Sequence, residues 1–317
     1  MTKETKGASH HVPVLLGPAI AGLNLKVDGW YVDGTFGRGG HSGAILNNLG
    51  PDGYLLAIDR DPQAISAAPE SLRNDPRLEL KHGEFSEVRR YAIDRKMLGK
   101  VDGLLLDLGV SSPQLDTAER GFSFQADGPL DMRMDPSAGE SAADWIATVE
   151  LRTLKRVLQQ YGEERFSGRI ARAIVAARSV ARITRTAQLA EIVRQAVPAR
   201  GQKRHPATKT FQAIRIHINN ELAELERALE ASIDLLRPGG RLCVISFHSL
   251  EDRRVKRFMR EHSREAEPYR GMPDVPPEHR PQLKLIGKAI GPSDEEIANN
   301  VRARSSRLRI AERLSCA

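Results

Sequence analysis

Cysteine is nearly absent from this chain, and long apolar runs are missing altogether. The 317 residues contain only two cysteines, Cys243 and Cys316, which are too few for a disulfide framework or a four-thiolate metal site. No apolar run approaches the roughly 20 residues that cross a bilayer. The N-terminal residues also lack the apolar segment of a signal peptide. We therefore expect a cytoplasmic protein with no membrane partner and no metal.

Acidic residues are scarce in one long stretch of the chain. Residues 151–219 contain 15 lysines and arginines but only three acids, although the net charge of the whole chain is +7. A localised basic surface is typical of proteins that bind a polyanion. The alternative is a set of solvated helix faces that bind nothing.

Apolar runs bounded by turn residues alternate with helical patterns in the first part of the chain. The runs predict strands at 31–33, 54–59, 78–81 and 101–107. The gaps between them predict helices at 41–49, 62–72 and 85–97. Such alternation is typical of an α/β fold with a parallel sheet and right-handed crossovers.

This alternation breaks after Gly109. Residues 110–140 are rich in Ser, Pro, Gly and Asp and indicate a long ordered loop, which in a compact protein is usually functional. Helical patterns follow at 141–160, 163–178, 186–197 and 208–236, with a basic linker at 200–206. Strands are predicted again at 241–247, 283–290 and 307–311. We therefore expect a sheet domain formed by 1–114 and 207–317, interrupted by a helical domain at 115–206.

A glycine-rich turn joins the first predicted strand to the first helix, within residues 31–42. Asp59 ends the next strand roughly 20 residues after Gly40, as in folds that bind a nucleotide through glycines and a ribose-binding acid. The glycine spacing differs from G-x-G-x-x-G, and Arg38 could contact a phosphate, so NAD stays open as the ligand. Asp33 would repel a pyrophosphate but attract an amino group, which favours S-adenosylmethionine.

More polar residues follow the strand predicted at 101–107. Ligands of open parallel sheets lie beyond the carboxyl ends of the strands. We therefore expect Asp107 and residues 111–114 to face the same crevice as Asp33 and Asp59. The alternative for residues 111–114 is a local turn closed by Pro113.

Two aromatic residues, Phe122 and Phe124, lie among Gly, Ser and acids rather than in a periodic apolar stripe. Exposed aromatics beside a cleft can stack an unpaired base. The alternative is that they anchor the loop on the core. His248 follows the strand predicted at 241–247, and we interpret it as a hydrogen-bonded position at a helix start, with Ser249 as the cap.

Motifs along nearly the whole chain match one known family. They occupy residues 33–42, 57–64, 106–116, 120–124, 128–135, 161–165, 210–216, 245–253 and 300–306. In these motifs the chain resembles the bacterial 16S ribosomal RNA cytosine-N4 methyltransferases, the RsmH or MraW family.

The resemblance implies a Rossmann-like class I methyltransferase sheet with an inserted, substrate-recognising helical domain. It implies S-adenosylmethionine as methyl donor and a cytidine of the decoding region as acceptor, reached within the small ribosomal subunit; a homodimer is compatible with it. The donor contacts that carry over from the family are Gly39, Gly40, His41, Asp59, Phe85, Asp107 and Gln114.

The cytosine N4 lone pair is delocalised into the ring, so N4 is a poor nucleophile until an acceptor takes one of its hydrogens. Asp107, or a main-chain carbonyl of Ser111, Ser112 or Pro113, is the candidate acceptor. Methylation at carbon 5 would instead need a cysteine nucleophile. Neither cysteine is placed for that role, which supports attack by nitrogen.

The target base must leave its stack to reach the cleft. We expect Phe122 or Phe124 to receive it, while Arg169 and Arg172 of the basic stretch hold phosphates. Two rival functions stay open from the residues alone. One is a nicotinamide-dependent oxidoreductase, and the other is a non-catalytic RNA-binding protein of ribosome assembly.

Overall fold

The computed structural model describes residues 13–198, 205–265, 267, 269, 271–273, 275–276 and 279–315. The chain separates into two compact units. The sheet unit comprises Met1–Asp59, Ala64–Leu108 and Ala228–Ala317, and the helical unit comprises Arg60–Gln63 and Gly109–Arg227. The helical insertion predicted at 115–206 lies within the second of these units.

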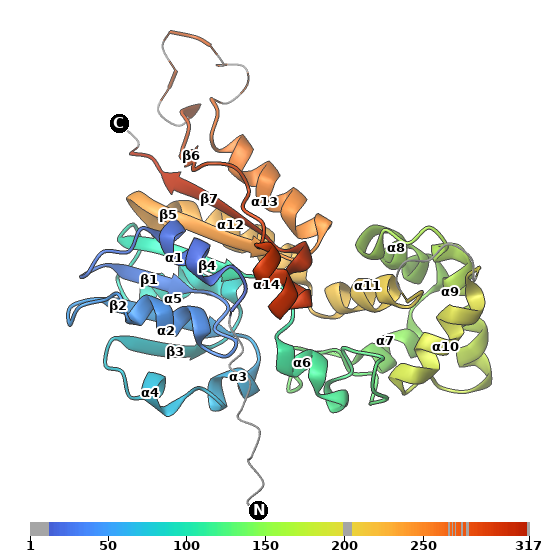
Figure 1. Ribbon diagram of the computed structural model, residues 1–317. Helices are drawn as coiled ribbons and strands as arrows, with labels where there is room; N and C mark the ends of the chain where they lie inside the picture. Colours follow the sequence, from blue (N-terminus) through green and yellow to red (C-terminus); the bar gives the residue numbers. More distant parts are fainter. Residues whose placement is uncertain are drawn as a thin grey trace, which may run out of the picture. The chain divides into compact units, whose positions relative to one another are not determined.

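One seven-stranded sheet forms the centre of the sheet unit, in the order β3-β2-β1-β4-β5-β7-β6 (Figure 1). The strands are β1 (Trp30–Asp33), β2 (Tyr54–Asp59), β3 (Leu78–His82), β4 (Val101–Asp107), β5 (Leu236–Ser246), β6 (Leu283–Leu285) and β7 (Arg307–Arg313). The first five in this order pair in parallel, as predicted. β7 is antiparallel to both β5 and β6, so the parallel expectation does not extend to the last strands.

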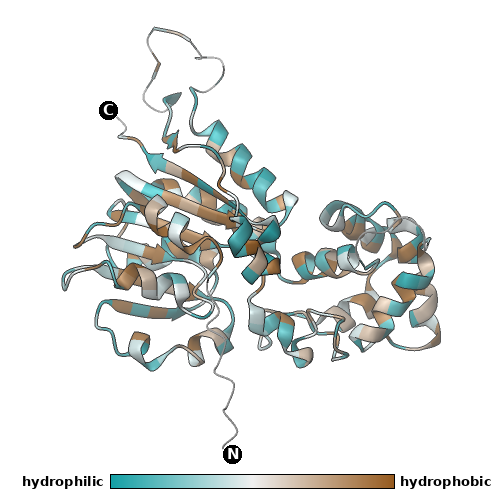
Figure 2. Cartoon of the chain, viewed as in Figure 1, coloured by the Kyte–Doolittle hydropathy of each residue, from teal (hydrophilic) through white to brown (hydrophobic). Residues whose placement is uncertain are grey.

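The central strands are buried on both faces, as their apolar runs require. Leu104, Leu105 and Leu106 are consecutive in β4, and all three are 0% exposed. On one face, Leu105 packs in a cluster with Leu23 of α1 (Leu16–Leu23) and Ile45 of α2 (Gly40–Leu46). Figure 2 shows these central strands as largely hydrophobic. The buried sheet gives a rigid edge from which loops can present functional groups.

Proline breaks one helix that the sequence pattern predicts as continuous. The predicted helix at 62–72 is two short helices, α3 (Pro62–Ser66) and α4 (Glu70–Arg73). Pro69 occupies the N-cap of α4, and a proline disfavours helical backbone at the residue before it. The predicted helix at 85–97 begins as the short 3-10 turn η1 (Phe85–Glu87) and continues as α5 (Val88–Asp94).

Helices account for most of the helical unit (Figure 1). They are α6 (Ser112–Asp116), η2 (Ala118–Arg120), α7 (Ala142–Thr148), α8 (Leu151–Gly162), α9 (Ser167–Val180), α10 (Thr186–Ala196) and α11 (Thr208–Ile218). The prediction of one helix over 141–160 is wrong, because the chain turns at Val149 between α7 and α8. The long loop predicted at 110–140 contains the short α6 and η2.

The continuous helix predicted over 208–236 is also wrong. α11 ends at Ile218 and α12 (Glu221–Leu235) follows, separated by a residue with left-handed backbone, Asn220, at φ 52°. Asparagine is among the few non-glycine residues that adopt this conformation readily. The remaining helices follow β5: α13 (Ser249–Glu261), α14 (Asp294–Asn299) and η4 (Val301–Ser305). Among the described residues, no helix combines the length and apolar character needed to cross a membrane.

Candidate functional site

The carboxyl ends of neighbouring strands bring three acids to one edge of the sheet. Asp33 ends β1, Asp59 ends β2 and Asp107 ends β4. β1 pairs in parallel with both β2 and β4. This is the edge at which open parallel sheets bind ligands. The topology of the sheet therefore brings these three acids to one edge, as predicted.

Asp33 holds the glycine loop together from inside. Its Oδ1 accepts a hydrogen bond from the main-chain N–H of Thr35 at 3.0 Å, and its Oδ2 accepts one from the hydroxyl of Ser42 at 2.7 Å. The side chain is 0% exposed. Burial raises the pKa of the Asp33 carboxyl, against the opposing effects of His41, Ser42 and Thr35. Its predicted attraction for a donor amino group stays a prediction.

The glycines of the loop are required by the packing of the protein itself. Gly37 and Gly39 have left-handed backbone, at φ +54° and +74°. A β-carbon on Gly39 would lie 2.5 Å from a methyl of Leu72, and one on Gly40 would lie 2.2 Å from Cγ of Pro13. The main-chain N–H of Gly37 donates to Asp59 Oδ2 at 2.7 Å. Asp59 therefore fixes the loop as well as being a candidate ribose contact.

Thr35 is a site residue that the sequence reasoning missed. Its hydroxyl accepts a hydrogen bond from the main-chain N–H of Asp107 at 2.6 Å, which ties the loop after β1 to the end of β4. Next to it, a β-carbon on Gly34 would lie 3.2 Å from Cβ of Phe85, so Phe85 approaches the same loop. The only signal in the sequence was the position of Thr35 directly after Asp33-Gly34.

His41 and Asp107 face one another across this edge. Nδ1 of His41 lies 3.6 Å from Oδ2 of Asp107, and His41 is only 5% exposed. Burial lowers the pKa of His41. The pKa of Asp107 is raised well above its ordinary value by burial and by the negative charges of Asp33 and Glu251.

Two atoms of this pair lack partners among the described residues. Oδ1 of Asp107 and Nε2 of His41 are both buried and make no hydrogen bond within the described part of the chain. A buried polar atom without a partner costs about 1–3 kcal/mol. Such atoms suit a ligand that brings its own polar groups. S-adenosylmethionine, with its amino group, carboxylate and ribose hydroxyls, fits this requirement.

At the start of α13, His248 rather than Ser249 is the cap. The His248 side chain accepts a hydrogen bond from the main-chain N–H of Glu251, and Oε2 of Glu251 accepts one from the N–H of Phe247 at 2.8 Å. The predicted hydrogen-bonded role of His248 at a helix start is confirmed, whereas the assignment of Ser249 as cap is wrong.

In the helical unit, residues 111–114 form a helix cap. The hydroxyl of Ser111 accepts from the N–H of Gln114, and Oε1 of Gln114 accepts from the N–H of Ser111 at 2.9 Å. Pro113 lies in the first turn of α6. The amide of Gln114 then donates to Oδ2 of Asp61 at 2.8 Å. This geometry matches the alternative of a local turn, and a donor contact by Gln114 stays a prediction.

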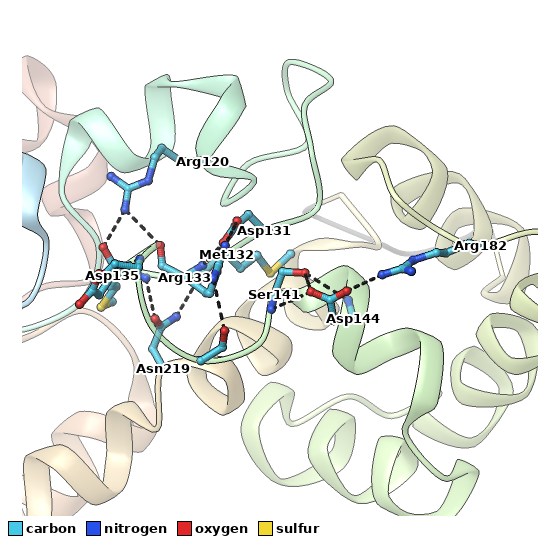
Figure 3. A network of polar contacts seen from close by, with 12 residues as sticks. Arg120, Asp131, Met132, Arg133, Asp135, Ser141, Asp144, Arg182 and Asn219 are labelled. Carbon is cyan, nitrogen blue, oxygen red and sulfur yellow. Dashed lines mark hydrogen bonds and ion pairs between the residues drawn. The ribbon is translucent and has the colours of Figure 1, made fainter.

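A network of buried polar contacts holds the loop at 128–135 (Figure 3). Arg120 donates to Oδ2 of Asp61 at 2.6 Å and to the carbonyl of Met134 at 2.8 Å. Asn219 donates to the carbonyl of Met132 and accepts from the N–H of Met134, both at 2.7 Å. Met132 has left-handed backbone at φ 62°, which these bonds stabilise. The sequence reasoning singled out the surrounding motifs but not Arg120 or Asn219.

The two predicted stacking residues pack against the core of the helical unit. Phe122 is 5% exposed and belongs to that core. The ring of Phe124 lies 4.5 Å from the ring of His205 and 4.9 Å from that of Phe211. These contacts match the alternative of a loop anchor. Arg169 and Arg172 are exposed on α9, as RNA contacts must be.

Three solved structures show weak similarity to this chain. An rRNA methylase from Streptococcus thermophilus has 12% identity and a TM-score of 0.42, covering 94% of this chain and 93% of its own. TrmN from Thermus thermophilus has 10% identity and a TM-score of 0.43, covering 95% and 48%. A SAM-dependent O-methyltransferase from Thermotoga maritima has 9% identity and a TM-score of 0.40, covering 95% and 64%.

The family assignment rests instead on the sequence. The model of the MraW methylase family matches residues 8–314, which is nearly the whole chain and includes residues of both units. The rival functions of a nicotinamide-dependent oxidoreductase and of a non-catalytic assembly protein are therefore wrong. The chain belongs to the MraW methylase family and is an S-adenosylmethionine-dependent rRNA methylase.

Proposed function

We propose that the protein methylates the N4 amine of one cytidine in the decoding region of 16S ribosomal RNA. The observation that carries this proposal is the buried, unpartnered Oδ1 of Asp107 at the carboxyl end of β4. A carboxylate there can accept an N4 hydrogen while the nitrogen attacks. Cys243, the one cysteine in the described part of the chain, is a poor nucleophile for the route to carbon 5, because burial raises its pKa to about 12 and suppresses the thiolate. Cys316 lies outside the described residues.

For the donor, we assign the sheet-unit residues that lie at this edge. Asp59 would hold the ribose hydroxyls and Phe85 would lie beside the adenine. Gly39, Gly40 and His41 would contact the methionine end. Bound S-adenosylmethionine supplies an electrophilic methyl group on its sulfonium. The protein's own contribution is to position this group, and positioning can supply most of the acceleration.

Asp33 and Gln114 would act differently from one another toward the donor. Both carboxylate oxygens of Asp33 are already bound by Thr35 and Ser42, so we assign it the role of shaping the loop and adding negative charge near the donor's amino group. Gln114 is retained as a direct donor contact because it occupies the matching position of the family motif at 106–116.

Asp107 is a better candidate for the N4 hydrogen than the carbonyls at 111–113. The carbonyl of Ser111 accepts from the N–H of Leu115 at 3.2 Å, and that of Pro113 accepts from Thr117 at 3.0 Å. These bonds belong to α6, whereas Oδ1 of Asp107 has no partner in the described part of the chain. Bound S-adenosylmethionine would supply the methyl group, and the ionised carboxylate of Asp107 would take the proton that N4 releases.

On the RNA side, Phe124 would receive the flipped base rather than Phe122, which is 5% exposed. Arg169 and Arg172 would hold nearby phosphates. The substrate would be the small ribosomal subunit or its RNA, which would place the protein in the cytoplasm, and a homodimer is compatible with this function. Charge reversal at Arg169 and Arg172 should weaken RNA binding at moderate salt; unchanged binding would assign both residues to a solvated face.

The test of the catalytic assignment replaces Asp107 by Ala and by Asn. Methyl transfer to 16S RNA and binding of S-adenosylmethionine are measured separately, the latter by calorimetry. Loss of transfer with unchanged donor affinity supports the role of Asp107 as hydrogen acceptor. Loss of both reduces Asp107 to a donor contact, and retention of both contradicts the assignment.

A further inference from the structure

A surface hollow of about 510 Å³ lies between α8 and the start of α9 in the helical unit. Its lining includes Lys155 and Gln159 of α8, Arg165 of the connecting loop, and Ser167 and Gly168 at the beginning of α9. The hollow includes part of the motif at 161–165, for which the proposed methyl transfer gives no role.

Six cations on α8, on α9 and in the loop between them have no acidic partner among the described residues, and two of them, Lys155 and Arg165, line the hollow. They are Arg152, Lys155 and Arg156, at helical spacing on α8, and Arg165, Arg169 and Arg172, at helical spacing along the loop and α9. None of the six forms an ion pair with an acid among the described residues, whereas seven other arginines of the helical unit do. Those seven are Arg120, Arg133, Arg182, Arg185, Arg194, Arg215 and Arg227.

Two of the unpaired cations converge on one point. The position that a β-carbon would take on Gly168 lies 3.7 Å from Cε of Lys155 and 3.7 Å from a terminal nitrogen of Arg172. Like charges held close together repel one another. An anion between them would turn this repulsion into attraction, so the arrangement suits a negatively charged ligand.

Two acids, Glu163 and Glu164, also line the hollow, and their charges oppose those of the cations. Glu164 is buried, and its carboxylate accepts a hydrogen bond from the main-chain N–H of Phe166 at 2.9 Å. The main-chain carbonyl of Glu163 accepts from Nζ of Lys209 at 2.9 Å, which brings a further cation to the same loop. With Arg172 and Lys209 added to Lys155 and Arg165, the cations at the hollow outnumber these two acids, so its surroundings carry a net positive charge.

We propose that this hollow binds a backbone phosphate of the RNA substrate, between Lys155, Arg165 and Arg172. The phosphate belongs to a nucleotide other than the methylated one, so the hollow fixes the register of the RNA rather than the chemistry. The identity of the RNA as methylation substrate rests on the proposed function, whereas phosphate binding by the hollow does not. A phosphodiester fits because it carries a single charge and needs donors but no acceptors.

The first test removes two cations and compares the result with a matched control. Lys155→Gln is combined with Arg165→Gln, and the control combines Arg182→Gln with Arg194→Gln, which removes the same charge from paired positions of the same unit. Binding of a labelled single-stranded 16S fragment is measured over a range of salt concentrations. Each lost phosphate contact lowers the slope of log affinity against log salt by about 0.7. We expect that decrease in the first double variant only. An unchanged slope, or an equal change in the control, overturns the proposal.

The second test fills the hollow. Gly168→Ala adds an uncharged β-carbon at ordinary contact distances of 3.7 Å or more, so it is the control for the added side chain. Gly168→Asp adds a carboxylate where the phosphate would lie, at a helix start where acids are favourable to folding. We expect Gly168→Asp to weaken RNA binding at least tenfold and to raise KM for RNA with kcat unchanged. Equal affinity of the Asp and Ala variants contradicts the proposal.

These binding measurements stand apart from the proposed function. If the wild-type protein binds the fragment through the hollow but leaves cytosine N4 unmethylated, the proposed function fails and the phosphate site remains. If N4 is methylated but neither pair of variants differs in RNA binding, the phosphate site fails and the proposed function remains.

Discussion

The carboxylate of Asp61 lies 2.6 Å from the guanidinium of Arg120, and both side chains are nearly buried. The same carboxylate oxygen of Asp61 accepts from Gln114, while Arg120 also donates to the carbonyl of Met134. This ion pair therefore connects the start of α6, which carries a proposed donor contact, to the loop at 128–135. Both features belong to the helical unit.

Replacing Arg120 by Ala should destabilise the protein strongly. The substitution leaves the carboxylate of Asp61 buried without its cation, and breaking a buried pair from one side costs about 3–5 kcal/mol. Urea unfolding measures the change in free energy. Arg194→Ala, which breaks the exposed Arg194–Glu191 pair, is the control and should change little. Equal effects of the two substitutions would show that the Asp61–Arg120 pair is not important for stability.

Replacing Thr35 by Val should damage the site with little change in shape. The variant removes the hydroxyl that accepts from the N–H of Asp107, and an unpaired buried N–H costs about 1–3 kcal/mol. We expect lower stability and slower methyl transfer, because the end of β4 is no longer tied to the loop. Thr35→Ser keeps the hydroxyl and should restore both. A Ser variant as impaired as the Val variant would contradict this role.

The raised pKa of Asp107 predicts a specific dependence of stability on pH. The folded state favours the neutral carboxyl, so this stabilisation is complete below the ordinary pKa of 3.8 and is lost as pH rises through the native value. Asp107→Asn should therefore be more stable than the wild type at neutral pH, and the difference should vanish on acidification. Urea unfolding across pH measures this, with the exposed Asp52→Asn as control. A less stable Asn variant at neutral pH would refute it.

Two alanine substitutions in the glycine loop should lower stability and donor affinity to different extents. Gly37→Ala introduces backbone strain at φ +54° but meets nothing closer than 3.9 Å, whereas Gly39→Ala combines φ +74° with a contact of 2.5 Å to Leu72. Strain alone costs on the order of 1 kcal/mol. We expect Gly39→Ala to lower both stability and donor affinity more than Gly37→Ala, as measured by thermal unfolding and calorimetry. The reverse order would show that packing against Leu72 does not shape the loop.

The parts of the fold that follow from local patterns could be predicted from the sequence. The bounds of β2 and β4 are those of their apolar runs, because a strand buried on both faces must be apolar throughout. The breaks at Pro69 and Asn220 escaped prediction, since helical periodicity continues across them. α1 also escaped, because nothing in its short sequence separates a helix from a loop.

In the site, the acids at strand ends could be predicted, but their partners could not. Asp33, Asp59 and Asp107 come together because parallel strands end at one edge. The bonds from Thr35 to Asp107 and from Arg120 to Asp61 join residues distant in sequence, and only the folded chain brings them together. Phe122 shows the opposite case, in which a residue that resembled a ligand contact is 5% exposed.

The central claim is methylation of cytosine at N4, and one measurement tests it most directly. The purified protein is incubated with S-adenosylmethionine and with small ribosomal subunits from a strain that lacks this protein. The 16S RNA is then digested and analysed by nucleoside mass spectrometry. The account predicts one new N4-methylcytidine in the decoding region, absent with Asp107→Ala. A methyl group at carbon 5 or on another base, or no new methyl group, would contradict it.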